Sequence, residues 1–265
     1  MIKAVIFDWA GTMVDYGSFA PVEAFRRVFA ERGIEASSEA IRKPMGRMKK
    51  DHLRDICSDP DVVKAWKGKY GRAIEENDID EMYEAFEPML FSILHLFSMP
   101  VPGAVELADQ LRALRIKLGT TTGYTRAMLD VILPEAAKLG YSPDCTVTPD
   151  EVKEGRPHPW MIYRCAELLG LTPSDGFVKC GDTEADMREG RNAGVWTVGV
   201  VFGGNELGLT LEETLQLSES DKERLYEEVA TKLTNAGAHY IIREISELEG
   251  IITPINERIQ LGEKP

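Results

Sequence analysis

Three carboxylates in this sequence lie where strands of a buried sheet would end, and together they could hold a metal ion. Asp8 directly follows the apolar run Ala4–Phe7, and Asp182 and Asp186 follow a second apolar run, Phe177–Cys180. Short apolar runs are typical of buried parallel strands, whose carboxyl ends meet at one edge of a sheet. Carboxylates gathered there repel one another unless a cation lies between them, and such an oxygen-rich site suits Mg²⁺. Taken alone, Asp8 could equally be a capping residue.

Groups that could bind an anion lie near the same predicted edge. Arg156 precedes Pro157, a setting usual for a surface residue, but beside an acidic cluster a guanidinium is a good anion clamp. Thr122 and the N–H of Gly123 follow the expected strand Ile116–Thr120 and could donate hydrogen bonds. Three carboxylates, Mg²⁺ and Arg156 carry no net charge, so a phospho dianion would also need these donors. The sequence therefore predicts a site for a phosphoryl group.

An alternation of strands and helices would position these residues. Besides the two apolar runs above, strands are expected over Ile116–Thr120, Cys145–Val147, Trp196–Val201 and, at an edge of the sheet, His239–Ile242. Helical patterns lie between them over 104–114, 126–139 with Thr125 as N-cap, 160–169 and 185–193. This alternation predicts an α/β fold, with a parallel sheet that helices cover on both faces.

The alternation is interrupted between residues 18 and 98, where every strong pattern is helical. Pro21 fits the first turn of a helix that stops at Gly33. Further helices are expected over 45–57, 61–74 and 79–96. Hinge-like segments flank this region at Tyr16-Gly17 and Pro100–Gly103. We therefore expect an all-helical cap domain over residues 18–98 and an α/β core domain over residues 1–17 and 99–265.

Composition limits the partners of the protein. The 265 residues include 31 Lys and Arg against 44 Asp and Glu, which gives a formal net charge of −13. Such an acidic chain is repelled by nucleic acids and anionic membranes, so we expect neither as a partner. The four cysteines are scattered and form no CxxC pair, which is typical of reduced thiols in a cytoplasmic protein. No signal peptide is recognised, and the apolar stretch 89–97 is too short to span a bilayer.

Four elements occur in a fixed order along the chain. They are a strand followed by Asp8, a strand followed by Thr122, then Arg156, and a strand followed by Asp182 and Asp186. This ordered set, which spans the chain, resembles the haloacid dehalogenase superfamily of phosphotransferases. The resemblance implies a Rossmann-like parallel sheet core with an inserted helical cap. It also implies that Asp8 is a nucleophile forming an aspartyl-phosphate, that Asp182 holds Mg²⁺ and that Arg156 grips the phosphoryl group.

One position departs from the pattern of the superfamily's phosphatases. Those enzymes usually carry a second Asp two residues after the nucleophile, and this Asp protonates the leaving oxygen. The present sequence has Ala10 there. Loss of a general acid slows such a reaction by roughly 10²–10⁴-fold. Either the leaving group needs no acid, or the activity differs.

The predicted cap offers a second reactive group. Met45, Met48, Lys49 and His52 fall at i, i+3, i+4 and i+7, so a helix over this segment would place them on one face. Most charged stretches are solvated helix faces, but this face is apolar apart from one amine and one imidazole. Such surroundings should depress the pKa of Lys49, as a Schiff-base lysine requires. His52 is a candidate for proton transfer during imine formation, or it packs against the core.

A lysine that forms an imine, opposite an aspartate that attacks phosphorus, defines a substrate with both phosphorus and an aldehyde. A protonated imine beta to phosphorus accepts the electrons of the C–P bond, so the departing group is an enamine that needs no proton on oxygen. Ala10 agrees with that chemistry. Six segments resemble the phosphonoacetaldehyde hydrolase (phosphonatase) family: Phe7–Thr12, Val14–Gly17, Lys43–Gly46, Lys49-x-Asp51-His52, Thr121–Thr125 and Gly155–Met161.

This second resemblance implies hydrolysis of phosphonoacetaldehyde to acetaldehyde and phosphate, through a Lys49 Schiff base and an Asp8 aspartyl-phosphate. Mg²⁺ would be held by Asp8, the Ala10 carbonyl and Asp182, with Asp186 in support. The residues expected at the substrate, besides Asp8 and Lys49, are Ala10, Met45, His52, Thr122, Gly123, Tyr124 and Arg156. By analogy with the family, the protein is expected to be a homodimer.

Three other functions remain open at this point. A capped phosphatase or phosphomutase of the same superfamily, acting on a small phosphate ester, would have Asp at position 10. A phospho-acceptor regulator similar to a receiver domain would not need the long helical insertion or the late pair of aspartates. A haloacid dehalogenase proper would not need Mg²⁺, and Asp182 and Asp186 argue against it.

Overall fold

A parallel sheet forms the centre of the protein. The computed structural model describes residues 1–265, except for the side chain of Asp175. Within the described chain the sheet has six strands in the order β3-β2-β1-β4-β5-β6, and every pair of neighbours is parallel. The strands are β1 (Ala4–Phe7), β2 (Lys117–Thr121), β3 (Cys145–Val147), β4 (Phe177–Gly181), β5 (Trp196–Val200) and β6 (Tyr240–Ile242). All the expected strands are confirmed within one or two residues, including the edge position of β6.

Register explains why side chains from different strands meet at one edge. β1 lies between β2 and β4, and Phe7 pairs with Thr120 on one side and with Cys180 on the other. The N–H of Asp8 donates to the Cys180 carbonyl over 2.8 Å, which continues the pairing by one residue. The residues that follow the three central strands therefore lie at the same carboxyl edge, as expected for a parallel sheet.

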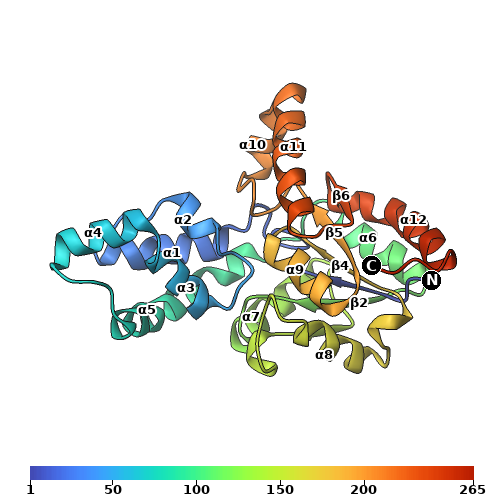
Figure 1. Ribbon diagram of the computed structural model, residues 1–265, viewed down its shortest axis with the longest axis horizontal. Helices are drawn as coiled ribbons and strands as arrows, with labels where there is room; N and C mark the ends of the chain where they lie inside the picture. The colour runs from blue at the N-terminus through green and yellow to red at the C-terminus, as the bar shows by residue number, and fades with distance from the viewer.

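Helices cover both faces of this sheet (Figure 1). They are α6 (Ala104–Ala113), α7 (Arg126–Lys138), α8 (Trp160–Leu169), α9 (Glu184–Ala193) and α12 (Leu248–Gln260). Side chains alternate along β1, so Val5 and Phe7 join one buried cluster, with α6 and α12. Ala4 and Ile6 join another, with α8 and α9. Thr125 caps α7 as expected, since its hydroxyl accepts the Met128 N–H.

Between β1 and α6 the chain forms a helical cap, which is a separate lobe beside the sheet (Figure 1). Its helices are α1 (Phe19–Glu31), α2 (Ser38–Arg42), α3 (Lys49–Cys57), α4 (Pro60–Tyr70) and α5 (Glu76–Leu94). The rings of Phe25 in α1 and Phe86 in α5 stack with centroids 4.2 Å apart. These findings confirm the expected α/β core with an inserted all-helical cap.

The helix expected over Met45–Cys57 is wrong at its beginning. The short helix α2, which was not expected, ends at Arg42, and α3 begins only at Lys49. Pro44 and Gly46 break the helical pattern between them, and Gly46 takes a φ of 85°, which favours glycine. Met45 therefore lies in a turn, and the expected shared helical face of the two methionines, Lys49 and His52 does not form.

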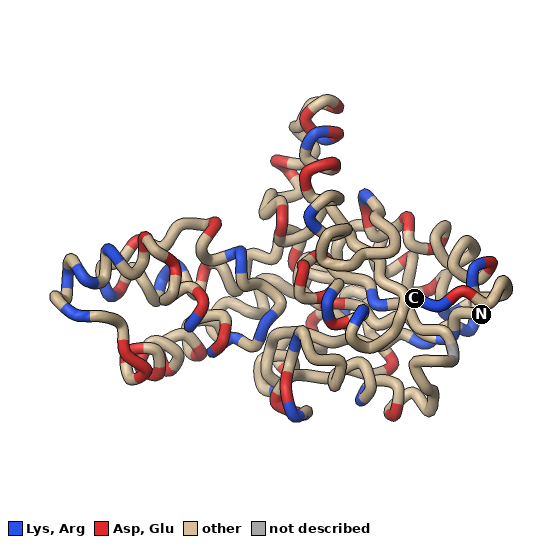
Figure 2. The backbone as a smooth tube through the Cα atoms, viewed as in Figure 1, with Lys and Arg blue, Asp and Glu red and all other residues tan. Residues whose placement is uncertain are grey.

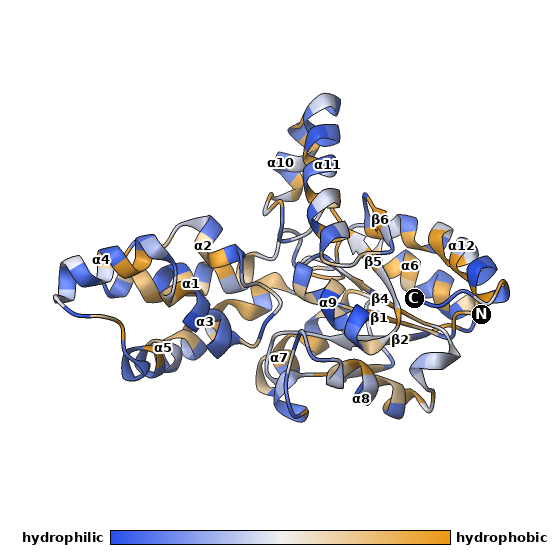
Figure 3. Ribbon diagram, viewed as in Figure 1, coloured by the Kyte–Doolittle hydropathy of each residue, from blue (hydrophilic) through white to orange (hydrophobic). Residues whose placement is uncertain are grey.

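A helical hairpin between β5 and β6 was also not predicted from the sequence. Its helices are α10 (Leu211–Gln216) and α11 (Glu219–Asn235). α10 and the beginning of α11 project away from the sheet (Figure 1), whereas the end of α11 packs on β5 and β6. Acidic residues, with a few basic ones between them, lie along the projecting part (Figure 2), and the hydrophobic residues concentrate instead on the sheet and the inner helix faces (Figure 3). Short 3-10 turns occupy His95–Phe97, Pro149–Glu151, Pro173–Asp175 and Ile245–Glu247.

None of the helices described here is long and apolar enough to cross a membrane.

Candidate active site

Three aspartates meet at the carboxyl edge of the sheet, as the sequence predicted. Asp8 follows β1 and Asp182 follows β4, while Asp186 lies in the first turn of α9. One carboxylate oxygen of each lies within 4.8 Å of those of the other two, and all three residues are buried. Thr183 and Asp186 form a capping box, in which the Thr183 hydroxyl donates to Asp186 Oδ2 over 2.6 Å. Oxygen ligands at this spacing suit a hard divalent cation.

Arg156 connects the nucleophile candidate to the other carboxylates. Its Nη2 lies 2.7 Å from Asp8 Oδ1, its Nη1 lies 3.0 Å from Asp186 Oδ1, and its Nε lies 3.0 Å from Glu189 Oε2. Nη2 also donates to the Thr121 carbonyl over 2.8 Å. The guanidinium is fully buried, so these contacts fix both its position and its plane.

A buried lysine, which sequence reasoning missed, completes this network. Lys179 Nζ lies 2.9 Å from Asp186 Oδ1 and 3.1 Å from Glu189 Oε2, and it donates to Thr121 Oγ1 over 2.7 Å. The signal was present in the sequence, because a lysine inside an otherwise apolar strand must be buried and paired. Glu189 lies three residues after Asp186, so it falls on the same face of α9.

The electrostatics of this site favour a divalent cation. Four buried carboxylates and two buried cations leave two negative charges, which a divalent cation would balance. Burial raises the pKa of Asp8 in spite of Arg156, and the charge of Asp186 raises it further. Burial and the charges of Asp8 and Asp186 raise the pKa of Asp182 well above its usual value. Burial alone would also raise the pKa of Asp186, but Arg156 and Lys179 outweigh it and hold that pKa low.

The loop after β1 packs against Asp182. The Thr12 hydroxyl donates to Asp182 Oδ1 over 2.6 Å, and the N–H of Asn205 donates to Oδ2 over 2.7 Å. Gly11 has a φ of 87°, and a Cβ atom on it would overlap the Asp182 carboxylate. Ala10 precedes this glycine, so its backbone lies beside the aspartate cluster. Both Thr12 and Asn205 escaped the sequence analysis.

Lys49 faces the site from the cap. It is the first residue of α3, and only 3% of it is exposed. Its Nζ lies 4.8 Å from the centre of the Tyr124 ring, which belongs to the core. Burial lowers the pKa of Lys49 to about 8. The charge of Asp8 raises this pKa, whereas the charge of Arg156 lowers it. The direction agrees with the sequence prediction, although neighbouring methionines on one helix face are not the cause.

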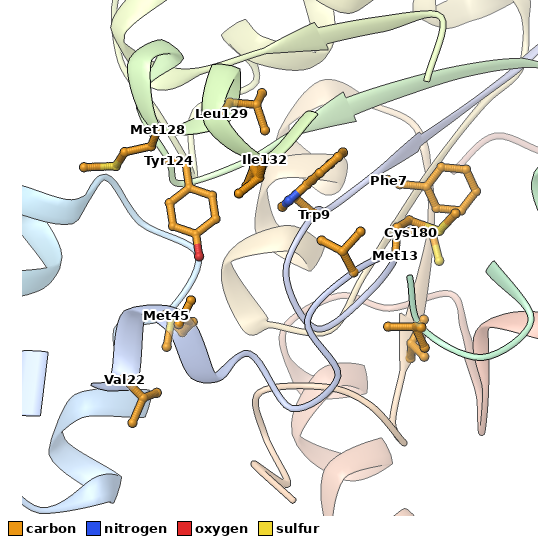
Figure 4. Close-up of a cluster of buried hydrophobic side chains, with 14 of the residues drawn as sticks. Phe7, Trp9, Met13, Val22, Met45, Tyr124, Met128, Leu129, Ile132 and Cys180 are labelled. Carbon is orange, nitrogen blue, oxygen red and sulfur yellow. The ribbon is translucent and has the colours of Figure 1, made fainter. Parts of the chain in front are cut away.

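Tyr124 and Met45 join the cap to the core. The Tyr124 ring stands between Met128 of α7 and the cap turn that carries Met45, with its hydroxyl end toward the cap (Figure 4). Both Tyr124 and Met45 belong to the main buried hydrophobic cluster. Thr122 is also buried, and its hydroxyl accepts the Tyr124 N–H over 3.2 Å. A Cβ atom on Gly123 would lie 3.1 Å from the Gly46 carbonyl oxygen of the cap.

The cap is closed on the core in this structure. Arg156 Nη1 donates to the Gly46 carbonyl over 3.4 Å. A Cβ atom on Gly46 would lie 2.7 Å from Thr183 Oγ1 and 3.4 Å from Arg156 Nη1, so only glycine allows this approach. The turn that breaks the expected helix is therefore the part of the cap that seats on the aspartate cluster.

His52 lies inside the cap. Its ring is buried, with its centroid 4.3 Å from that of Phe25, and its Nε2 lies 2.6 Å from the Ile41 carbonyl oxygen. Burial, with the nearby charge of Lys49, holds the pKa of His52 well below its usual value, so the ring is neutral. A carbonyl can only accept, so Nε2 carries the proton and Nδ1 has a free lone pair. Among the described residues, no group hydrogen-bonds to Nδ1.

We predict that Glu189→Gln destabilises the protein and slows its reaction. Arg156 and Lys179 would keep their charges in a buried site after losing a shared partner. Removing one partner of a buried ion pair costs about 3–5 kcal/mol of unfolding free energy. Glu184→Gln on the same helix is the matched control, because Glu184 pairs with Arg188 near the surface and such pairs contribute about 0–1 kcal/mol. Urea unfolding measures both variants, and equal losses would contradict the prediction.

The fold and the site agree with comparisons to known proteins. A sequence model of the haloacid dehalogenase-like hydrolase family matches residues 2–194. The chain therefore belongs to the haloacid dehalogenase-like hydrolases. The crystal structure of a beta-phosphoglucomutase from Clostridium difficile shares the fold, with a TM-score of 0.70 at 21% identity over 98% of this chain and 99% of that one.

Closer relatives define the family further. The phosphonoacetaldehyde hydrolase of Bacillus cereus (strain G9842) is 49% identical over 257 residues, which are 97% of each protein. The crystal structure of a phosphonoacetaldehyde hydrolase-like protein from Oleispira antarctica superposes with a TM-score of 0.97 at 40% identity, covering 100% of this chain and 96% of that one. The chain is thus a hydrolase of the phosphonoacetaldehyde hydrolase family.

One relative is longer than this chain. The bifunctional phosphonoacetaldehyde hydrolase/aminoethylphosphonate transaminase of Clostridioides difficile (strain 630) is 48% identical over 260 residues. That alignment takes in 98% of this chain but 41% of the bifunctional protein. The match therefore concerns one part of that protein.

Proposed function

We propose that this protein hydrolyses the C–P bond of phosphonoacetaldehyde, giving acetaldehyde and phosphate. One observation supports the proposal above all: a buried amine with a lowered pKa, Lys49, and a buried carboxylate held by Arg156, Asp8, belong to one closed site. Ala10 leaves that site without the general acid that an ester phosphatase would need. The names of the relatives agree with this substrate.

The reaction begins at Lys49 and ends at Asp8. The neutral Nζ of Lys49 adds to the aldehyde carbon, and the oxygen of the resulting carbinolamine takes up a proton and leaves as water, which gives a protonated imine. Asp8 attacks phosphorus while the electron pair of the C–P bond moves into the imine, which becomes an enamine. A proton on the terminal carbon regenerates an imine, and water releases acetaldehyde from Lys49. A second water hydrolyses the aspartyl-phosphate and frees phosphate.

The other residues bind the substrate or move protons. Arg156, the Thr122 hydroxyl and the Gly123 N–H would hold the phosphoryl oxygens, because they lie at the carboxyl edge beside Asp8. Tyr124 would cover the imine, since its ring lies against Lys49 Nζ, and the Met45 side chain would close the same space. The family resemblance assigns proton transfer during imine formation to His52, although its burial lowers the pKa of the ring and makes the unpaired Nδ1 a weak base.

Mg²⁺ fits the aspartate cluster, since its donors are all oxygens and the site carries excess negative charge. Asp8, Asp182 and the Ala10 carbonyl would hold the ion, and Asp186 would support them. When bound, Mg²⁺ would neutralise charge on the carboxylates and the phosphoryl group.

We predict that Mg²⁺ raises the melting temperature of the wild-type protein, because a ligand that binds only the folded state stabilises it. In calorimetry, Asp182→Asn should lose this shift, whereas a shift of unchanged size would contradict the assignment.

We also propose that residues 1–17 and 99–265 form the core domain and residues 18–98 the cap domain. The two connecting segments run side by side, since the Asp15 N–H donates to the Met99 carbonyl over 3.0 Å and the Val101 N–H donates to the Met13 carbonyl over 2.9 Å. A paired hinge of this kind allows the cap to open and close as one body. A cytoplasmic location, inferred from the scattered cysteines, and a homodimer, inferred from the family resemblance, complete the proposal.

Borohydride trapping tests the proposed function. The protein is incubated with Mg²⁺ and phosphonoacetaldehyde, sodium borohydride is added, and the modified residue is mapped by mass spectrometry. The proposal expects an ethyl group on Lys49, which requires both imine formation and C–P cleavage. An unmodified Lys49, with phosphate released instead from small phosphate esters, would make the protein a capped phosphatase with an unidentified acid.

A further inference from the structure

One arginine of the cap contacts the core at a second place, apart from the cap turn that lies on the aspartate cluster. Arg42 is the last residue of α2, and its Nη1 donates to the Gly17 carbonyl over 2.7 Å and to Asn205 Oδ1 over 3.1 Å. Asn205 Nδ2 donates back to the Arg42 carbonyl over 3.1 Å. Hydrogen bonds therefore run in both directions between one cap residue and one core residue. The Arg42 guanidinium also lies 4.9 Å from the centre of the Phe19 ring.

The core partner of Arg42 also contacts a metal-ligand candidate. The Asn205 N–H donates to Asp182 Oδ2 over 2.7 Å, and Asn205 is 1% exposed. Two residues thus connect α2 of the cap to the carboxylate of Asp182. The contact depends on the position of the cap, because Arg42 and Asn205 are 163 residues apart and lie on opposite sides of the hinge.

The surroundings of Arg42 allow this contact to form and break. Burial lowers the pKa of Arg42, while the charges of Asp15 and Asp182 raise it and favour a cation there. Arg42 and Asn205 also line a surface groove of about 300 Å³ between the cap and the core, with Glu206 on its core side. Water in such a groove can replace the hydrogen bonds when the cap opens.

We propose that Arg42 and Asn205 form a clasp that holds the cap closed. This inference rests on the proposed function, since a closed cap is what brings Lys49 to Asp8. Both are positioning residues, because neither touches the reacting atoms. Loss of either residue would lower the fraction of molecules whose cap is closed. The apparent dissociation constant for substrate then rises in inverse proportion to that fraction.

Kinetics of four variants test the clasp. We expect Arg42→Ala to raise KM about 10- to 100-fold and to change kcat by less than about threefold. Asn205→Ala keeps the backbone N–H on Asp182, so an equal rise in KM would come from the clasp and not from Asp182. The double variant should be no worse than either single one. Arg27→Ala is the control, since Arg27 is an exposed cap arginine that pairs with Glu23 inside the cap.

A distance measurement tests the clasp without any substrate. Spin labels are attached at Ser38→Cys in α2 and Thr231→Cys in α11, both exposed, after the half-buried Cys145 has been changed to Ser. Pulsed electron–electron double resonance should give one short distance between the two labels when the clasp is unaltered. Arg42→Ala and Asn205→Ala should each add a longer separation, whereas Arg27→Ala should not.

The outcomes separate the clasp from the proposed function. Unchanged separations in both clasp variants would overturn the clasp, as would effects on kcat/KM that simply multiply in the double variant. If the wild-type protein does not cleave phosphonoacetaldehyde, the proposed function fails, and the separations still decide whether the clasp exists. Circular dichroism excludes misfolding as the cause of a longer separation. Arg42→Lys keeps a charged hydrogen-bond donor at this position, so it should give an intermediate KM.

Discussion

Lys49→Ala is expected to lower kcat/KM for phosphonoacetaldehyde by at least about 10³-fold, because the reaction loses its electron sink. Without the imine, the electrons of the C–P bond would leave as a carbanion. The remaining groups at Asp8 could not compensate, since in the proposed reaction Arg156 and the aspartates act on the phosphoryl end only. Coupled assays for phosphate and for acetaldehyde measure the loss.

Two further variants make the Lys49 result specific. Lys49→Arg keeps a positive charge at this position, but a guanidinium stays protonated and forms no imine, so it should be as inactive as Lys49→Ala. Lys50→Ala is the matched control, since Lys50 is the next residue of α3 and pairs with Asp80 outside the site. It should stay within about twofold of the wild type, because such surface pairs contribute little. An active Lys49→Arg enzyme would show that charge, and not imine formation, is what the reaction needs.

The elements of the core could be predicted because each depends on local sequence. The buried strands read as continuous apolar runs, and the carboxyl edge of a parallel sheet then gathers Asp8, Asp182 and Thr122 without further information. The helix expected over Met45–Cys57 was wrong at its beginning, because the apolar spacing that predicted it takes no account of Pro44 and Gly46, which interrupt a helix.

Contacts between distant segments lay beyond the sequence. Lys179 and Glu189 sit on different elements and pair only because α9 packs against β4 and β5. The clasp joins Arg42 to Asn205 across the hinge, and no local pattern marks either residue. His52 shows the same limit, since spacing placed it with Lys49 whereas packing sets its ring against Phe25. Local sequence thus predicted that the aspartates and Arg156 lie together, whereas tertiary packing brought in Lys179 and Glu189 and determined how the groups are held.

Asp8→Asn separates the two halves of the proposed reaction. Asparagine has nearly the shape of aspartate, but its amide is no nucleophile toward phosphorus, so phosphate release should fall by at least about 10⁴-fold. Lys49 is untouched and lies in the cap, so it should still form the imine with phosphonoacetaldehyde. Borohydride should then leave a 2-phosphonoethyl group on Lys49, where the wild-type protein acquires an ethyl group.

The mass of the Lys49 adduct decides the order of events. An intact phosphonate on Lys49 in the Asp8→Asn protein means that the imine forms first and that Asp8 then cleaves the C–P bond. An ethyl adduct in that variant would mean that another group attacks phosphorus, and Asp8 would lose its assigned role. Asp51→Asn is the control, because Asp51 is half-exposed and pairs with Arg54 on the surface of the cap. It should keep both phosphate release and the ethyl adduct, since it touches neither Lys49 nor the aspartate cluster.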